Sequence, residues 1–307
     1  MHSTQPFELL ILGSSAATPT ANRNPTAQLL NIAERFFLID CGEGTQMQFR
    51  KYKARFQNVN HIFISHLHGD HFYGLPGLLG SMHLLGRKNP LTIYAPKELK
   101  EIIELIHKHS DTHLNYPLHF VFTQHKIKQL IFEDDKVEVY SIPLKHRVPT
   151  TGFLFKEKPL PRNIDKYKLE KLNVSFAEIH KLKQGFDAED NYGNIIKNED
   201  LTNDPPKPRS YAFCSDTKFF IELIEDIKSV DLLYHESTFL EDKKDRAKET
   251  YHSTACQAAE IAKQAMVNQL IIGHFSARYG SLDDFLAEAK TIFPNTELAT
   301  EGSTFKI

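Results

Sequence analysis

Short apolar segments alternate with helical ones along most of the 307-residue chain, and this alternation restricts the fold more than any other feature. Apolar runs bounded by turn residues predict strands, and they fall at 7–12, 27–32, 35–39, 61–65, 91–95, 118–122, 129–132, 137–142, 210–214, 231–235, 269–273, 297–299 and 304–307. Amphipathic or alanine-rich stretches predict helices at 43–52, 75–85, 98–107, 218–227, 253–266 and 282–293. Two β-rich halves, each flanked by helices, predict an α/β chain in which two sheets pack face to face with helices outside.

One segment between the two halves breaks this pattern. Its apolar density falls, and between residues 156 and 183 eight Lys or Arg residues stand against four Asp or Glu residues. A run with three prolines, 204–208, closes the segment. We interpret 156–209 as a flexible arm inserted into a single domain that spans 1–307. A solvated surface loop with a short helix is the alternative.

The composition restricts the class of protein. A net charge of -2 argues against a protein that coats nucleic acid by bulk charge, although a local basic patch stays possible. No apolar run approaches the roughly 20 residues needed to cross a bilayer, and the first six residues lack the apolar core of a signal peptide. The cysteines Cys41, Cys214 and Cys256 are far apart and form no CxxC pair. They predict a reducing compartment, by default the cytoplasm, and argue against a structural zinc held by thiolates.

Four side chains that can bind metal ions fall within six residues, directly after the predicted strand that ends at residue 65. They are His66, His68, Asp70 and His71. A turn between strand and helix can aim the first two in one direction and the last two in another. Neutral imidazole and carboxylate are ligands that zinc accepts in open catalytic sites. Solvated loop residues are the alternative, and an apolar strand immediately before the cluster makes that alternative weaker.

One cluster cannot complete two metal sites, so further ligands must come from later in the chain. His146, Asp216 and His274 each follow a predicted strand. Strand ends at one edge of a sheet converge in space, which is where such folds place their sites. A single histidine after a strand is more often a surface or capping residue, but together with the cluster these three residues predict a metal centre.

Several stretches resemble known motifs. The segment from His66 to His71, with the later His, Asp and His residues, resembles the metallo-β-lactamase superfamily. Four further features narrow the resemblance to the ribonuclease Z family of tRNA 3′-processing endonucleases. Phe37–Gln46 is similar to the first motif of that family, and His235-Glu-Ser-Thr238 is similar to its HEAT motif. His252-Ser-Thr254 is similar to its HST loop, and His274-Phe-Ser-Ala-Arg-Tyr279 is similar to its HFSxRY segment. The resemblance runs nearly from end to end.

The resemblance implies a metallo-β-lactamase fold, a four-layer αβ/βα sandwich whose site lies at the edge between the two sheets. The arm 156–209 stands where the family carries an exosite that grips tRNA. The resemblance also implies two Zn²⁺ ions per subunit with Asp216 bridging them; one ion would be bound by His66, His68 and His146, and the other by Asp70, His71 and His274. Short members of the family are usually homodimers in which the arm of one subunit serves the site of the other.

The activity implied is that of a zinc-dependent endoribonuclease, which removes the 3′ trailer of precursor tRNA and leaves a 3′-hydroxyl on the tRNA and a 5′-phosphate on the trailer. Two zinc ions about 3.5 Å apart can hold a hydroxide and clamp both oxygens of an in-line displacement, although the same ligands also accept manganese or iron. Asp70 would accept the proton of the attacking water. His252, oriented by Glu236, is the candidate proton donor to the leaving oxygen, with helix capping as the alternative role. Arg278 is a candidate phosphate contact or a surface ion-pair partner.

Two stretches depart from the family pattern. Loop 19–24 keeps Arg23 and Asn24, which are candidate substrate contacts, but has Ala21 where the family usually has lysine. In the family this loop is linked to discrimination between precursors with and without CCA. The arm has 173–178 in place of a Gly-Pro element, and its candidate tRNA contacts are Lys166, Lys168 and Lys171.

Other functions share parts of this pattern. Another hydrolase of the superfamily, such as a general phosphodiesterase, an arylsulfatase-like enzyme or a lactonase, would have the same metal ligands. A non-catalytic nucleic-acid-binding module with a structural metal is a different class, and it is disfavoured because structural zinc sites fill their coordination with protein ligands.

Overall fold

Two seven-stranded sheets form the larger of two units in the chain, which comprises Met1–Lys156 and Arg209–Ile307. The computed structural model describes residues 5–170, 172 and 174–307. The first sheet has the order β20 (Thr304–Lys306), β1 (Phe7–Gly13), β3 (Ala27–Ile32), β4 (Arg35–Ile39), β5 (Val59–Phe63), β6 (Leu91–Ala95) and β7 (Leu118–Phe122). The second has the order β19 (Thr296–Leu298), β17 (Gln269–Gly273), β16 (Leu232–Glu236), β15 (Ser210–Cys214), β10 (Thr151–Glu157), β9 (Val137–Pro143) and β8 (Gln129–Glu133).

The inner faces of the two sheets pack against each other through aromatic side chains. Successive residues of a strand point to opposite faces, so Phe63 faces the second sheet while Ile62 and Ile64 face outward. Ring centroids are 5.3 Å apart between Phe63 and Phe153, which lie in different sheets. Strands buried on both faces read as continuous apolar runs, which is the pattern that the sequence carries.

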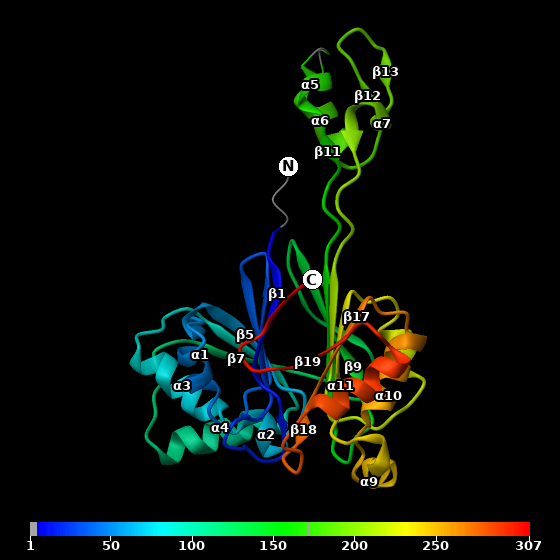
Figure 1. Cartoon of the computed structure of the whole chain (residues 1–307). Helices are drawn as coiled ribbons and strands as arrows, with labels where there is room; N and C mark the ends of the chain where they lie inside the picture. The colour runs from blue at the N-terminus through cyan, green and yellow to red at the C-terminus, as the bar shows by residue number, and fades with distance from the viewer. Residues whose placement is uncertain (1–4, 171, 173) are drawn as a thin grey trace. The chain divides into compact units, whose positions relative to one another are not determined.

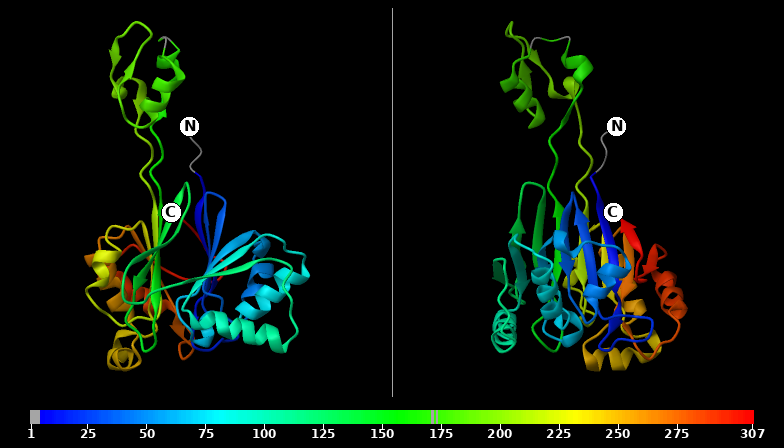
Figure 2. Two further views of the ribbon diagram at one scale, coloured as in Figure 1. Left: turned by 180° about the vertical axis from the view of Figure 1, so that it is seen from behind. Right: turned by 90° about the vertical axis from the view of Figure 1, so that its left-hand side faces the viewer.

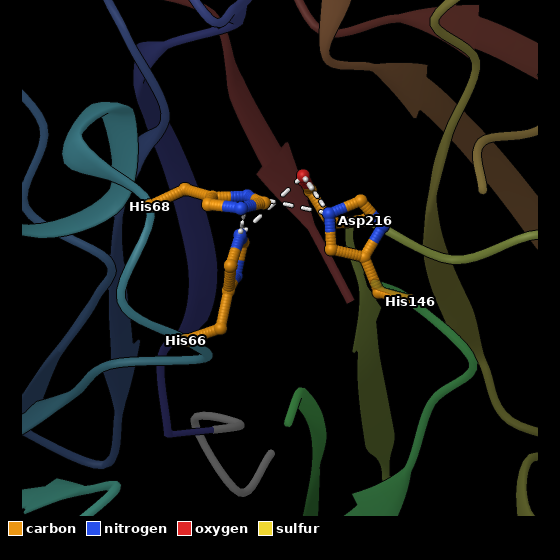
Figure 3. A group of neighbouring side chains, drawn as sticks. All are labelled: His66, His68, His146 and Asp216. Atoms are coloured by element: carbon orange, nitrogen blue, oxygen red, sulfur yellow. Dashed lines mark hydrogen bonds and ion pairs between the residues drawn. The ribbon is translucent and has the colours of Figure 1, made fainter. Parts of the chain in front are cut away.

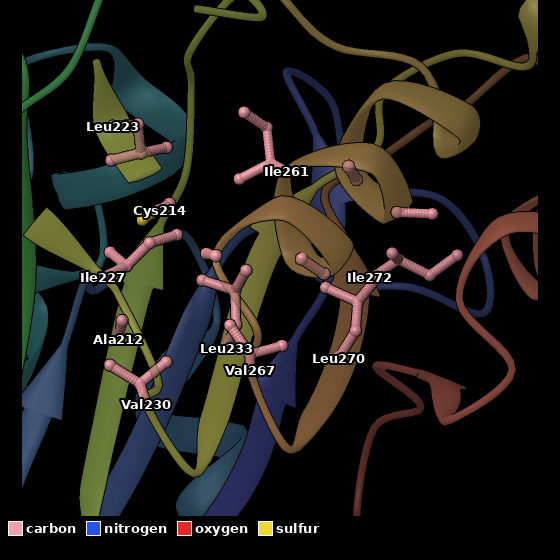
Figure 4. Close-up of a cluster of buried hydrophobic side chains, with 14 of the residues drawn as sticks. Ala212, Cys214, Leu223, Ile227, Val230, Leu233, Ile261, Val267, Leu270 and Ile272 are labelled. Atoms are coloured by element: carbon pink, nitrogen blue, oxygen red, sulfur yellow. The ribbon is translucent and has the colours of Figure 1, made fainter. Parts of the chain in front are cut away.

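Helices cover the outer face of each sheet, so the unit has four layers (Figures 1 and 2). The first sheet is covered by α1 (Thr45–Lys51), α3 (Leu75–Leu84) and α4 (Glu98–His109). The second is covered by α8 (Leu223–Asp226), α10 (Ala255–Gln264) and α11 (Asp283–Ile292). Buried alanines of α10 and the aliphatic side chains of β16 and β17 share one core (Figure 4). Among the described residues, every helix is too short or too polar to span a membrane.

Shorter elements complete the larger unit. β2 (Ser15–Ala16) and β18 (Phe275–Ser276) form a parallel pair outside the two sheets. The short helices are η1 (Phe56–Asn58), α2 (Gly69–Phe72), η2 (Glu241–Lys243) and α9 (Lys244–Thr250). Helix α10 begins after Thr254, whose side chain forms a capping box with Gln257, so the backbone N–H groups of these two residues are satisfied.

Most of the predicted elements are present, with differences at a few places. The prediction of a helix over 218–227 is wrong in length, because only α8 is helical. The backbone N–H of Lys218 instead donates to the carbonyl oxygen of Lys145, and this ties the segment to the loop that carries His146. Strand β10 was not predicted, although it is a central strand whose first five residues are buried.

The second unit, Glu157–Pro208, has a core of its own. Its elements are β11 (Asn163–Ile164), α5 (Lys166–Leu169), α6 (Phe176–Lys183), β12 (Ala188–Glu189), β13 (Ile195–Ile196), α7 (Asn198–Leu201) and β14 (Thr202–Asn203). Leu182, Ala188 and Leu201 are buried together. The side-chain amide of Asn198 donates to the carbonyl oxygens of Leu182 at 2.7 Å and of Phe186 at 2.9 Å. The segment is therefore a small folded unit inserted between β10 and β15, which are antiparallel neighbours.

Candidate metal centre

Four of the seven predicted ligands meet in a first group (Figure 3). His66 Nε2 lies 3.0 Å from His68 Nδ1, which in turn lies 3.3 Å from His146 Nε2. Asp216 Oδ2 lies 3.5 Å from His66 Nε2 and 3.6 Å from His146 Nε2. Three imidazole nitrogens and one carboxylate oxygen therefore point at one small volume.

The remaining predicted ligands form a second group beside the first. Asp70 Oδ2 lies 3.4 Å from the Nε2 atoms of both His71 and His274. Asp216 Oδ1 lies 3.1 Å from His71 Nε2 and 3.0 Å from His274 Nε2. The two oxygens of Asp216 thus face different groups, as a bridging ligand requires.

Both groups have the dimensions of a site for a metal ion. Ligand atoms about 2.0–2.1 Å from a tetrahedral ion lie about 3.3–3.4 Å from one another. The distances above bracket that value. His71 Nε2 is fully buried and has no hydrogen-bond partner in the described part of the chain, and such an orphaned nitrogen is costly unless a cation occupies the space beside it. The donor set and its spacing therefore fit metal ions.

Backbone geometry at strand ends aims these side chains. His66 and His68 follow β5 and His146 follows β9, while α2 carries Asp70 and His71. Asp216 follows β15 and His274 follows β17, and both have left-handed backbones, with φ of 56° and 60°. Residues with a Cβ rarely adopt this conformation, and it costs of the order of 1–3 kcal/mol where tertiary structure imposes it. The two sheets together thus supply the candidate ligands, from the segments that follow their strands.

Hydrogen bonds behind the ligands fix which nitrogen each histidine presents. Asp40 Oδ2 accepts from His71 Nδ1 at 2.6 Å, and Asp40 is itself held by the backbone N–H and hydroxyl of Ser65, at 2.8 and 2.9 Å. The carbonyl oxygen of Tyr251 accepts from His146 Nδ1 at 3.0 Å. In both cases Nδ1 carries the proton, so Nε2 keeps its lone pair for a metal.

A buried carboxylate orients a further histidine beside the ligands. Glu236 Oε1 accepts from His252 Nδ1 at 2.8 Å. Glu236 is fully buried and also accepts from the backbone N–H groups of Thr217, Thr238 and Ser253 and from the Thr238 hydroxyl. Thr238 Oγ1 in turn lies 2.9 Å from His274 Nδ1, so one carboxylate serves both His252 and a ligand of the second group.

Charges around the second group stabilise positive charge there. Burial raises the pKa of Asp216, but the neighbouring charges of His274 and His71 and the hydrogen bond of His274 outweigh burial and hold this pKa well below its usual range. Burial lowers the pKa of His274, yet the Asp216 charge and the hydrogen bonds of His274 to Asp216 and Asp70 raise it to about 10. The carboxylates therefore keep a cation between them, as a proton when no metal is bound.

The histidines of the first group have lowered pKa values instead. Burial is the main cause of the lowered pKa values of His66, His68 and His146, and for His146 the pKa falls to about 4. These imidazoles are neutral at physiological pH, which is the form that binds metals. For His252, burial lowers the pKa but the charge and hydrogen bond of Glu236 outweigh it and raise the pKa above its ordinary value.

A cavity of about 590 Å³ opens over the ligands. Besides ligands it is lined by His252, the exposed ring of Tyr73 and three arginines, Arg147, Arg246 and Arg278. Three guanidinium groups around one cavity suit an anionic substrate with phosphates. Arg278 Nε also donates to the Ser276 hydroxyl at 3.1 Å.

The other predicted substrate contacts lie elsewhere. Arg23 donates to the carbonyl oxygens of Ser276 at 3.3 Å and Tyr279 at 2.8 Å, and the side chain of Asn24 donates to Glu301; neither residue lines the cavity. In the second unit, Lys166 is exposed, and Lys168 Nζ donates to the carbonyl oxygen of Asp200 at 2.9 Å. Lys171 and Asn173 lie outside the described residues.

Several residues of the centre were not predicted as site residues. Asp40 and Thr238 lie inside stretches that were noted only as motifs, and the hydrogen bonds that connect them to ligands span up to 36 residues of sequence. Arg147 directly follows a ligand, which could have marked it. Arg246 carries no such signal, because α9 is simply a charged helix.

Comparisons with known proteins agree with this geometry. A protein-family model described as Anti-Pycsar protein Apyc1 matches residues 7–160. The ribonuclease Z of Cytophaga hutchinsonii is 51% identical over 302 residues, which cover 98% of this chain and 96% of the relative. The ribonuclease Z of Bacteroides fragilis is 46% identical over 96% of this chain and 97% of the relative.

Solved structures support the fold that the resemblance implies. The crystal structure of human tRNase Z, short form, matches with a TM-score of 0.69 and 25% identity, over 97% of this chain and 98% of that one. The metallo-beta-lactamase fold protein YhfI from Bacillus subtilis matches with a TM-score of 0.70 and 17% identity, over 99% and 100% of the two chains. The expected fold is therefore confirmed. With full-length relatives at such identity, the chain belongs to the ribonuclease Z family, and its first half also carries the sequence pattern of the Apyc1 family.

Proposed function

We propose that this chain is a metal-dependent endoribonuclease that removes the 3′ trailer from precursor tRNA, leaving a 3′-hydroxyl on the tRNA and a 5′-phosphate on the trailer. The observation that carries the proposal is the pair of ligand groups that share Asp216 at the floor of a cavity lined by three arginines. Relatives named ribonuclease Z over nearly the full length, and human tRNase Z among the similar structures, support tRNA as the substrate.

The residues described above would hold two ions, and we propose Zn²⁺. One ion would be held by His66, His68 and His146, the other by Asp70, His71 and His274, with one oxygen of Asp216 for each. Two bound ions would supply an activated water at neutral pH and neutralise charge that develops on the phosphate. Imidazole and carboxylate also bind Mn²⁺ and Fe²⁺; Zn²⁺ is proposed because histidine nitrogens and carboxylate oxygens are the ligands of its open catalytic sites.

Asp70 is positioned to take the proton of the attacking water. Its Oδ2 faces His71 and His274 and accepts from the backbone N–H of Ala17 at 2.7 Å. Its Oδ1 has no hydrogen-bond partner among the described residues and belongs to a side chain that lines the cavity. The pKa of Asp70 is held below its usual range because the charge of His71 and the hydrogen bond to His274 outweigh burial, so the carboxylate is ionised.

His252 is positioned to protonate the leaving 3′-oxygen. Its Nδ1 proton is engaged by Glu236, which leaves Nε2 for the cavity. The raised pKa favours the protonated imidazole, the form that a general acid requires. Glu236 orients the ring and stabilises its charged form.

We propose that the second unit binds the tRNA and takes no part in the chemistry. Its exposed lysines, among them Lys166 and Lys181, could contact phosphates of the tRNA body. We further propose that the chain acts as a homodimer, as the family resemblance implies, and works in the cytoplasm. The three cysteines are free in the structure, which suits a reducing compartment.

The decisive test maps the 3′ end left on a precursor tRNA that carries a 3′ trailer, with and without a chelator. A single new 3′-hydroxyl end at the trailer junction, abolished by the chelator and restored by Zn²⁺, is the expected result. The rival function is a phosphodiesterase or arylsulfatase-like hydrolase with the same ligands. Rapid cleavage of a small diester or aryl sulfate together with an intact precursor would support the rival and contradict the proposal.

A further inference from the structure

Glu301, far from the metal ligands in sequence, is bonded to the loop that borders them. It lies in the turn between β19 and β20. Its carboxylate accepts from both the backbone N–H and the side-chain amide of Asn24, the latter at 3.0 Å. It also accepts from Gln48 Nε2 at 2.6 Å, so three donors from two elements converge on one side chain.

Asn24 is connected in turn, through backbone hydrogen bonds, to segments on both sides of the second ligand group. Its carbonyl oxygen accepts from the backbone N–H groups of Ser14 at 3.0 Å and Ser15 at 2.9 Å. The carbonyl oxygen of Ser14 then accepts from the N–H of Phe275, the residue after His274, at 2.9 Å. Further along the same loop, Ala17 donates its N–H to Asp70 Oδ2 at 2.7 Å.

Close packing leaves this loop little room to shift. A Cβ added at Gly13 would lie 1.8 Å from the carbonyl oxygen of Pro25, and one added at Gly42 would lie 2.4 Å from the carbonyl oxygen of Asp70. Ala17, which donates to Asp70, has a left-handed backbone with φ of 58°. A non-glycine residue holds this conformation only where the surrounding contacts impose it.

We propose that Glu301 is a positioning residue for the second ligand group. It anchors Asn24, and through Asn24 it fixes the loop that carries the backbone donor to Asp70 and, through Ser14, the residue that follows His274. Among the described residues, the hydrogen bonds behind His66 and His146 of the first group go instead to Ser65 and to the carbonyl oxygen of Tyr251. This inference rests on the two-ion function proposed above.

A reversed donor and acceptor pair provides the test. Asn24→Asp places a second carboxylate against Glu301, and Glu301→Gln places an amide against the amide of Asn24. The double variant restores the contact in the opposite sense, with the amide at 301 donating to the carboxylate at 24. Glu8→Gln removes a half-exposed carboxylate from the neighbouring strand β1 and is the matched control.

The measurement titrates metal-free protein with Zn²⁺ by calorimetry and records kcat and KM on precursor tRNA. Each single variant should raise the dissociation constant of the second Zn²⁺ ion by about 10- to 100-fold and leave that of the first ion unchanged. Each should also lower kcat without raising KM. The double variant should recover part of both quantities, because the contact between side chains 24 and 301 returns while Gln48 Nε2 then faces an amide donor, and Glu8→Gln should match the wild type.

Three outcomes would overturn the inference. The first is an unchanged dissociation constant for the second Zn²⁺ ion in both single variants, and the second is an equal rise in the dissociation constants of both ions. The third is a double variant that binds the second ion no more tightly than the single variants do. A wild-type protein that binds only one Zn²⁺ would instead overturn the two-ion proposal itself, so the two failures can be told apart.

Discussion

Removal of the imidazole at His252 isolates proton donation from metal binding. His252 donates through Nδ1 to Glu236 at 2.8 Å and presents its other nitrogen to the cavity. Without the imidazole, Glu236 still accepts four hydrogen bonds, from Thr217, Thr238 and Ser253. The buried carboxylate is therefore not left unpaired, and His252→Ala should cost only about 1.5–3 kcal/mol of stability, the value of one charged hydrogen bond.

The catalytic cost should be larger and should depend on the leaving group. General acid catalysis contributes about 10²- to 10⁴-fold, which corresponds to roughly 3–5 kcal/mol of barrier. The ribose 3′-oxygen leaves as a strongly basic alkoxide unless it is protonated. Nitrophenolate is a far weaker base and leaves unprotonated. We therefore expect kcat on precursor tRNA to fall by that factor and the rate on bis-p-nitrophenyl phosphate to fall much less.

The assay compares the two substrates for the wild type, His252→Ala and His119→Ala, an exposed histidine away from the cavity that serves as the control. Bound metal is measured for each protein, because His252 also lies within reach of Asp216 and His274 as a possible ligand. An equal loss on both substrates, or the loss of one metal ion from His252→Ala, would refute the role of proton donor.

Three further predictions follow from the same contacts. In Glu236→Gln, the pKa of His252 loses the charge that raises it, so the basic limb of the kcat profile should move to lower pH; an unmoved limb would contradict this. Asp216→Asn should weaken both metal ions together, whereas Asp70→Asn should weaken one, as measured by metal content after dialysis. Replacement of 157–208 by a short glycine turn should raise KM for precursor tRNA at least tenfold and leave bis-p-nitrophenyl phosphate cleavage intact, since β10 and β15 are adjacent; unchanged tRNA affinity would exclude the arm as a tRNA grip.

Most of the fold could be predicted from the sequence, because strands that are buried on both faces appear as continuous apolar runs. The strands 27–32, 35–39, 91–95, 118–122, 210–214 and 269–273 were predicted with the observed bounds. The helix over 218–227 failed because Lys218 bonds to a neighbouring loop, a tertiary contact that local propensity cannot include. Strand β10 was missed because the charged arm begins within it.

The candidate site was predictable to the extent that its chemistry is written in residue type. Histidine and aspartate after apolar strands marked seven candidate ligands, and the structure brings their side chains into two neighbouring groups. The residues behind them were not predictable in the same way, because threonine, serine and a backbone carbonyl carry no distinctive signal. Thr238 and Ser65 acquire their roles only when the chain folds and brings them against ligand nitrogens.

Each ion would be held by side chains from both β-rich halves of the molecule. The first half supplies His66 and Asp70, for example, and the second supplies Asp216 and His274. An ion bound in this way is a cross-link between the halves, so the loaded protein should resist heat and proteases better than the stripped one, by about 2.7 kcal/mol when free metal exceeds its dissociation constant 100-fold. During synthesis, the second ligand group stays incomplete until His274 has emerged, although the last member of the first group is Asp216. A nascent or truncated chain therefore cannot cleave RNA before it has folded to its far end.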